Sequence, residues 1–279
     1  MGNEERTFAQ LVEAFLAIYA EGEAPPLPVV VKFIPAGGEL PEGATDPADH
    51  PGIPWCKAVR LACEEGEAVT VTVDNVGCPA AAIALGLVNQ FSESALAGRR
   101  EYTDLMDEAA APADFTRGLV YACQGIGFPQ FAIFREADAG RYETLGAALK
   151  AVAGMKAIQP PIMKAAIAYR AEAMDVAPDV VILPLKPKQA MLAIEGYTYP
   201  TGKRVTLDTV GVRGVCSDLT AIPFLSQELN GSLFCVGARA LGGWAGSLMA
   251  LGMPLYVFRQ MVNGMEKSAT GYPYAAFPE

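Results

Sequence analysis

One order of features recurs three times along this sequence: a short apolar run, a brief loop, and then a helix rich in small residues. It occurs from AVTVTVD (68–74) into AAAIALGLV, from PDVVILPL (178–185) into KQAMLAIEGY, and from GSLFC (231–235) into VGARALGGW. Short β-branched runs indicate strands, and apolar residues spaced three and four apart indicate helices. We therefore expect an α/β or mixed α+β fold, with strand-loop-helix units around a mixed sheet.

Other segments add to this pattern. Apolar periodicity predicts helices over 6–21, over 142–152 and from Trp55, and it also predicts a helix over 159–174 that begins at a proline. The run LPVVVKFI (27–34) predicts a strand, and residues 131–134 form a weaker candidate. Residues 35–54 are rich in glycine, proline and acidic side chains, which indicates a surface loop. No linker composition divides the chain, so we expect residues 1–279 to form a single compact domain.

Charge and hydropathy limit the partners of the protein. The net charge is −10 and no run of lysine or arginine occurs, which disfavours nucleic acid as a partner. The nineteen uncharged residues from Ala240 to Phe258 are interrupted by glycines and a proline, so we expect a core segment rather than a membrane span. The N-terminal residues do not resemble a signal peptide. These features predict a cytoplasmic protein, and the 52% apolar content mildly favours a homo-oligomer.

Several common catalytic and metal-binding motifs are missing. The sequence contains no Walker A motif, no complete dinucleotide-binding glycine motif, no HExxH and no CxxC. His50 is the only histidine, so a Cys₂His₂ zinc site is excluded, and a serine or cysteine dyad would have to use this one residue. Because His50 lies in the loop DPADHPGIP, we expect its side chain to be solvated and dispensable.

The six cysteines are then the main candidates for chemistry: Cys56, Cys63, Cys78, Cys123, Cys216 and Cys235. In a reducing compartment they are expected to be thiols or metal ligands rather than disulfides. A free cysteine often packs as a small apolar residue. Cys63 shares a predicted helix face with Cys56 and Val59, so we expect it to lie in the core, whereas Cys123 allows either interpretation.

Cys78 and Cys235 each occupy the turn at which a predicted helix begins. Cys78 precedes Pro79, and the amides of the next helical turn, together with the helix dipole, would favour a thiolate there with a lowered pKa. Cys235 is followed by Gly237, which permits close backbone approach, and by Arg239 one turn later. A thiolate in either place could be a metal ligand or a nucleophile.

Six motifs in this order resemble the uncharacterised DUF169 family: PVVVKF, WCKAVRLA, VGCPAAAIALGL, PDVVILPLKPKQAMLAIEGYTY, GVCSDLTAIP and LNGSLFCVGAR. The resemblance runs from about residue 28 to 258. It implies recurrent cysteines at the positions of Cys56, Cys78, Cys216 and Cys235, with Gly-Ala-Arg after the last. Members are common in anaerobic archaea and bacteria, and the family has no agreed activity. The predicted helix over 159–174 departs from the family pattern, so nothing is transferred to residues 100–175, including Cys123.

These observations leave two functional hypotheses and a structural one. In the first, Cys56, Cys78, Cys216 and Cys235 hold an iron–sulfur cluster, or less favourably zinc, because four thiolates are a common ligand set for both. Loops at the ends of parallel strands could bring them together. In the second, a metal-free enzyme or binding protein uses Cys78 or Cys235 as a nucleophile, with Arg239 and Gly237 binding an anionic group. In the third, the cysteines only pack. A small-molecule or redox partner fits the first two hypotheses.

Overall fold

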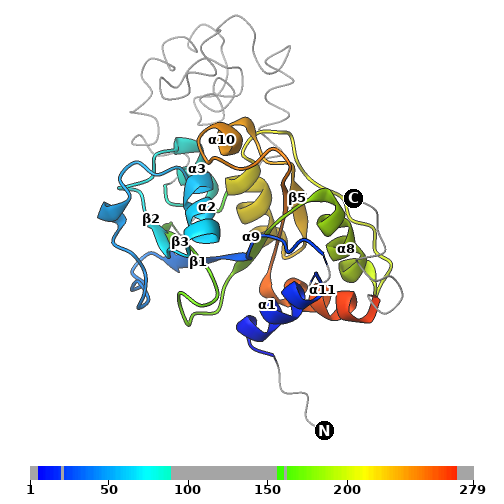
Figure 1. Ribbon diagram of the computed structural model, residues 1–279. Coiled ribbons are helices and arrows are strands. Elements are labelled where there is room, and N and C mark those ends of the chain that lie inside the picture. The colour runs from blue at the N-terminus through cyan, green and yellow to red at the C-terminus, as the bar shows by residue number, and fades with distance from the viewer. Residues whose placement is uncertain (1–5, 20–21, 89–155, 160–161, 269–279) are drawn as a thin grey trace, which may run out of the picture.

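The sheet has six strands in the order β2-β3-β1-β4-β6-β5, and every pair of neighbours in it is antiparallel. This computed structural model describes residues 6–19, 22–88, 156–159 and 162–268 (Figure 1). The strands are β1 (Val29–Pro35), β2 (Val69–Val71), β3 (Met163–Tyr169), β4 (Val180–Leu185), β5 (Asn230–Ser232) and β6 (Met249–Met253). The mixed α+β alternative is therefore confirmed, whereas the expected mixed sheet is antiparallel throughout these strands.

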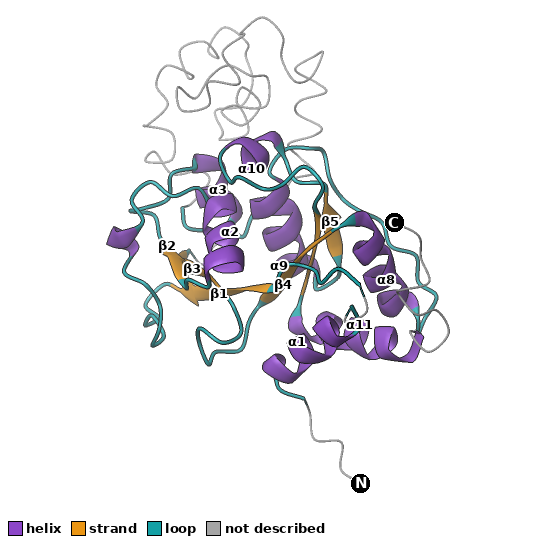
Figure 2. Ribbon diagram, in the orientation of Figure 1, coloured by secondary structure: helices purple, strands orange, loops and turns teal. Residues whose placement is uncertain are grey.

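Helices cover both faces of this sheet (Figure 2). They are α1 (Phe8–Ala17), α2 (Trp55–Glu65), α3 (Pro79–Ala84), α8 (Pro187–Thr198), α9 (Ile222–Ser226), α10 (Val236–Ala240) and α11 (Leu255–Ser268). A single 3₁₀ turn, η1 (Pro47–Asp49), and a π-helix, η4 (Gly214–Ala221), complete the described helical elements. Most of these helices begin within three residues of the predicted positions.

Alternation along β1 divides the core in two. Val29, Val31 and Phe33 contribute to one apolar cluster, which they share with α2, α3 and η4. Val30 and Ile34 contribute to the other, which they share with α1, α8 and α11. Successive side chains of a strand point to opposite faces, so one apolar strand can anchor a layer of helices on each side. All four cysteines expected to form a site lie on the first of these faces.

The helix expected over 159–174 is wrong, because β3 lies there. Its alanine-rich sequence favours a helix in isolation, but β3 is paired with β1 on one side and β2 on the other. The small side chains of Ala165, Ala166 and Ala168 are fully buried between the helical layers. Tertiary pairing and burial therefore override local helix propensity in this segment.

The structure describes the uncharged stretch over 240–258 but does not describe the candidate elements between residues 123 and 152. The uncharged stretch from Ala240 to Phe258 contains the buried strand β6 and the start of α11. Within the described ranges, no helix is long and apolar enough to cross a membrane. Cys123, the candidate strand over 131–134 and the candidate helix over 142–152 lie outside the described residues.

Candidate functional site

Four cysteines from distant parts of the chain gather on the first face of the sheet. Cys56 lies in the first turn of α2, Cys78 caps α3, Cys216 lies within η4 and Cys235 caps α10. Cys216 belongs to the apolar cluster on this face, and the other three pack against it. Figure 1 shows α2, α3 and α10 at the same end of the molecule. The structure thus brings together the four positions predicted as metal ligands.

The thiols are close enough to influence one another electrostatically. A negative charge on Cys235 or Cys78 raises the pKa of Cys56, and a charge on Cys235 also raises the pKa of Cys78. Cys216 responds in the same way to each of the other three. Every pair among the four therefore interacts through charge, so these thiols lie within electrostatic range of one another.

Cys63 is a fifth described cysteine and does not share this coupling. It is buried in the core, and its thiol donates to the carbonyl oxygen of Leu27 at 3.4 Å. Burial raises its pKa to about 12, and the charges that act on it are those of Glu64, Arg170 and Arg60. Cys63 therefore packs in the core, as its position on the helix face predicts.

A short parallel bridge holds the starts of α2 and α3 together. Ile53 pairs with Val76, the Ile53 amide donates to Asn75 O at 2.9 Å, and the Gly77 amide donates to Ile53 O at 2.9 Å. A Cβ at position 77 would overlap the carbonyl group of Gly52, so only glycine permits this approach. Cys56 follows one partner of the bridge by three residues, and Cys78 follows the other by two.

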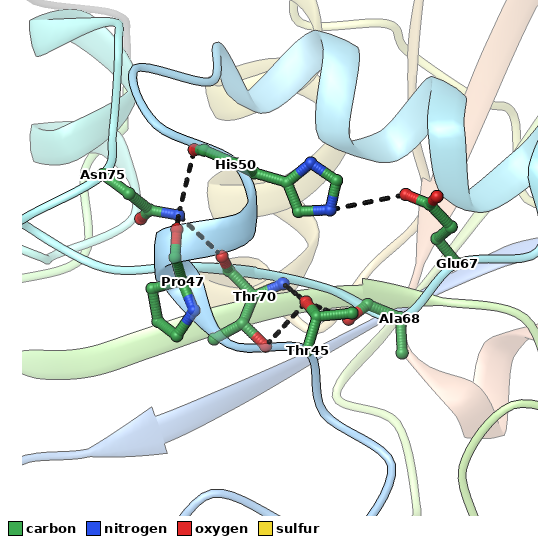
Figure 3. A network of polar contacts seen from close by, with 7 residues as sticks. All are labelled: Thr45, Pro47, His50, Glu67, Ala68, Thr70 and Asn75. Carbon is green, nitrogen blue, oxygen red and sulfur yellow. Dashed lines mark hydrogen bonds and ion pairs between the residues drawn. The ribbon is translucent and has the colours of Figure 1, made fainter.

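Asn75 fixes the loop that leads into this bridge (Figure 3). Its buried carboxamide donates to Pro47 O at 2.9 Å, Thr70 O at 3.0 Å and His50 O at 3.3 Å. Because a buried carboxamide is stabilising only when its hydrogen bonds are made, these contacts fix the loop to the end of β2. The loop over 35–54 is consequently ordered around Asn75 before it enters α2.

A second close approach joins η4 to the turn before α10. A Cβ at position 214 would lie 2.8 Å from the amide nitrogen of Cys235 and 2.8 Å from Ser232 Oγ. The absence of a side chain at Gly214 therefore lets the start of η4, which carries Cys216, lie against Cys235. The Cys56 thiol in turn donates to Gly237 O at 3.8 Å, which places α10 beside α2.

Burial controls the protonation of these thiols. It is the largest cause of the raised pKa of Cys56, Cys78 and Cys216. The amides of Ala80 and Ala81 do contact Cys78, as expected, and lower its pKa, but their effect is smaller than that of burial. The predicted lowered pKa of Cys78 is therefore wrong, because removal from water outweighs the helix start. Without a bound cation, these three thiols are protonated at neutral pH.

Arg213 is a residue that the sequence analysis missed. It is buried, adopts φ 59° immediately before η4, and lowers the pKa of both Cys78 and Cys216 by its positive charge. A buried cation beside two thiols would stabilise their ionised forms. The available signal was an arginine between glycines, three residues before Cys216, in GVRGVC.

Arg239 contacts the backbone rather than an open anion site. Its Nη2 donates to Leu233 O at 2.8 Å and Leu248 O at 2.7 Å, while Nη1 donates to Trp244 O at 3.5 Å and to Ala245 O. Both terminal nitrogens are thus engaged with main-chain carbonyl groups. An anion would have to compete with these contacts, so the expected anion-binding role remains a prediction without support from this geometry.

His50 is less solvated than its loop sequence indicates. Its side chain is 18% exposed, and Nε2 lies 3.4 Å from Glu67 Oε2 (Figure 3). The hydrogen bond that Asn75 makes at this position uses the His50 backbone oxygen, which any residue would provide. We therefore expect His50→Ala to reduce the free energy of unfolding by less than about 1 kcal/mol, measured by urea denaturation. A larger loss would show that the imidazole itself holds the loop.

Asp218 is a buried carboxyl group within η4. Thr209 Oγ1 donates to its Oδ2 at 2.7 Å and Ser232 Oγ at 3.1 Å, while burial raises its pKa to about 7. The folded state therefore retains a proton that the unfolded chain releases above pH 4, so this residue makes stability fall as pH rises towards 7.

This property gives a prediction for Asp218→Asn. An amide does not titrate. Between pH 5 and pH 7 the free energy of unfolding should therefore decrease by roughly 2 kcal/mol less in the variant than in the wild type. Urea denaturation at the two pH values measures the difference. Equal pH dependence in both proteins would mean that Asp218 is ionised in the folded state.

The described side chains do not enclose a single metal ion. In the ranges that the structure covers, no group of three or more histidine, cysteine, aspartate or glutamate side chains is placed to hold one ion.

Comparison with known proteins extends over most of the chain. A family model with the description "Uncharacterised ArCR" matches residues 25–264. This range includes all four cysteines as well as Arg213 and Arg239. No curated protein and no solved structure matches the sequence.

Proposed function

Since this chain belongs to the DUF169 family, which carries no described activity, we propose a function from its own residues: Cys56, Cys78, Cys216 and Cys235 bind an iron–sulfur cluster. The observation that carries the proposal is the convergence of four cysteines from distant segments on one apolar cluster, within electrostatic range of one another. Four cysteine thiolates are the usual ligands of two-iron and four-iron clusters. A zinc ion on the same four ligands is the alternative.

The surroundings of the thiols support this choice. Backbone amides contact the sulfur atoms: the Ala238 amide donates to Cys235 Sγ at 3.3 Å, and those of Ala80 and Ala81 contact Cys78. Hydrogen bonds to sulfur are one means by which a protein sets the potential of a cluster. Arg213 supplies a positive charge beside two of the ligands.

Metal binding at three of these thiols must release protons, because their raised pKa values keep them protonated in the metal-free protein. Each thiol must be deprotonated to bind metal, and burial opposes deprotonation of Cys56, Cys78 and Cys216 in the metal-free protein. The proposed site should therefore take up metal more weakly as pH falls. The same raised pKa values weigh against a metal-free enzyme with Cys78 as nucleophile, because a protonated buried thiol reacts slowly.

A bound cluster would supply one-electron transfer or activation of a small molecule. The chain's part is to keep the ligands on one face and to enclose them among apolar side chains. We propose a redox protein or small molecule as the partner, within a reducing cytoplasm that keeps free thiols available. The acidic net charge of −10 weighs against nucleic acid.

Anaerobic reconstitution of the full chain tests the proposal. The protein is incubated with ferrous iron and sulfide, or separately with zinc, desalted, and analysed for iron, sulfide, zinc and free thiols. We expect iron and sulfide in equal amounts, broad visible absorption, and four thiols fewer than in the metal-free protein. One zinc per chain without iron would favour the alternative. A colourless protein with every thiol still titratable would exclude both metals.

A further inference from the structure

Phe234 has an unusual backbone conformation directly before Cys235. Its φ is 63°, a left-handed value that only two other described non-glycine residues, Arg213 and Gln227, adopt. A residue with a bulky side chain is disfavoured there, because its Cβ approaches the following carbonyl oxygen. Such strain persists only where the surrounding structure over-determines it, and it often occurs at functional sites.

Two neighbouring side chains hold the Phe234 ring. It stacks on Trp244 with 4.8 Å between ring centroids and 18° between planes, and the Arg239 guanidinium lies 4.8 Å from the Phe234 centroid. The Phe234 ring is buried, and its amide donates to Ser232 Oγ at 3.2 Å. We call these three side chains the Phe234–Trp244–Arg239 stack. The two contacts hold the ring in place, and therefore hold the peptide that leads to Cys235.

Arg239 joins the backbone on the two sides of Cys235 through hydrogen bonds. It lies one helical turn after this cysteine, yet it donates to the carbonyl oxygen of Leu233, two residues before it. The same guanidinium reaches Leu248 O on the segment that leads into β6. A planar group with several fixed donors can join these carbonyl groups in one geometry, which a lysine ammonium cannot reproduce.

The stack also reaches Cys56. Trp244 Nε1 donates to the backbone oxygen of Cys56 at 2.9 Å, and the Cys56 thiol donates to the backbone oxygen of Gly237 in α10. The start of α2 and the start of α10 are therefore joined through one buried aromatic pair. Two of the four proposed ligands depend on the same three side chains.

We infer that the Phe234–Trp244–Arg239 stack is a positioning device, which uses the strained Phe234 backbone to turn Cys235 and Cys56 towards the other thiols. This inference rests on the proposed cluster and adds residues that touch the ligands without binding metal. Relaxation of Phe234 to negative φ would rotate the peptide before Cys235 and redirect its sulfur atom. Arg239 thereby acts on the backbone of the site rather than on an anion.

Four variants of the full chain test the inference. Phe234→Gly accepts positive φ without strain but loses the stack; Arg239→Lys retains the charge but not the planar fork; Trp244→Phe retains an aromatic ring but not the donor to Cys56. Gln227→Gly is the matched control, because Gln227 has φ 58° and lies on the other side of β5, after α9. Each is reconstituted, checked for folding by circular dichroism, and analysed for iron content, electron paramagnetic resonance and reduction potential.

We expect Phe234→Gly and Arg239→Lys to bind several-fold less iron per folded chain, and their residual cluster to have a shifted potential and altered resonance. Trp244→Phe should show a smaller change of the same kind, and Gln227→Gly none. A merely structural role would lower the folded fraction without changing the potential of the cluster that remains. Wild-type iron content, spectrum and potential in folded Phe234→Gly and Arg239→Lys would overturn the inference.

A metal-free measurement separates this inference from the proposed function. Dibromobimane links two thiols only when they lie close together, so the rate at which the Cys56–Cys235 cross-link forms at alkaline pH, followed by peptide mapping, reports the relative orientation of these two residues. We expect the cross-link to form several-fold more slowly in Phe234→Gly than in the wild type or Gln227→Gly. If the wild type binds no cluster but this difference is found, the proposed function fails and the positioning role holds. If the rates are equal, the positioning role fails.

Discussion

Replacement of Cys56, Cys78, Cys216 or Cys235 by alanine is expected to lower bound iron by about tenfold or more, because each change removes one of four thiolate ligands. The five single variants, including Cys63→Ala, would be purified without oxygen, reconstituted in parallel, and analysed for iron and sulfide per folded chain. Cys216 should be among the most sensitive, since it is the most buried of the four and is coupled to each of the others.

Cys63→Ala is the matched control for this series. It removes a buried thiol from the same helix as Cys56, so it should reduce stability by about 1–2 kcal/mol but leave iron content unchanged. The prediction fails if Cys63→Ala loses as much iron as the other four, or if all five retain it. The first result would indicate that the substitutions damage the fold. The second would show that these four cysteines are not the metal ligands.

The second large effect is expected at Gly77. In Gly77→Ala the new methyl group would overlap the carbonyl group of Gly52, within the bridge that joins the starts of α2 and α3. Because backbone atoms on both sides must move, the free energy of unfolding should fall by about 3 kcal/mol or more. Displacement of this bridge would also separate Cys56 from Cys78, so iron binding should fall together with stability.

Gly246→Ala provides the comparison, because a Cβ at position 246 meets no atom within 4 Å and the residue lacks a positive φ. It should leave both stability and iron content near wild-type values, as measured by urea denaturation and iron analysis. Retention of wild-type stability in Gly77→Ala would show that the bridge can shift without cost.

The sequence predicted individual helices and strands better than it predicted which strands pair in the sheet. Apolar runs marked β1 and β4, and Pro79 marked the start of α3, because these signals depend on residues close in the chain. β3 was missed because its alanine-rich segment has no local feature that opposes a helix; its strand conformation depends on hydrogen bonds to β1 and β2. The antiparallel pairing was likewise not predictable from order alone, since it depends on contacts between distant segments.

The site shows the same division. The resemblance to DUF169 pointed to the four cysteine positions, but it did not show which effects determine the pKa values of their thiols. Local features at Cys78 predicted a low pKa, whereas burial, which only the folded structure determines, raises it. Arg239 was expected to bind an anion beside Cys235, whereas its partners in the structure are the carbonyl groups of Leu233 and Leu248, and no local pattern shows which carbonyl groups a guanidinium will meet. Arg213 was missed because a buried arginine and an exposed one look alike in a sequence.

The central position of β1 has a consequence for how the chain matures. Both of its neighbours in the sheet, β3 and β4, lie more than a hundred residues later in the chain. During synthesis this very apolar strand therefore emerges long before its partners and must wait unpaired, which makes it a target for chaperones. Contacts such as that between Cys56 and Gly237, 181 positions apart, form only after the segment that carries Gly237 has been synthesised. Metal insertion at the proposed site would then have to wait for the synthesis of Cys235, and a chain interrupted before this residue would lack part of the ligand set.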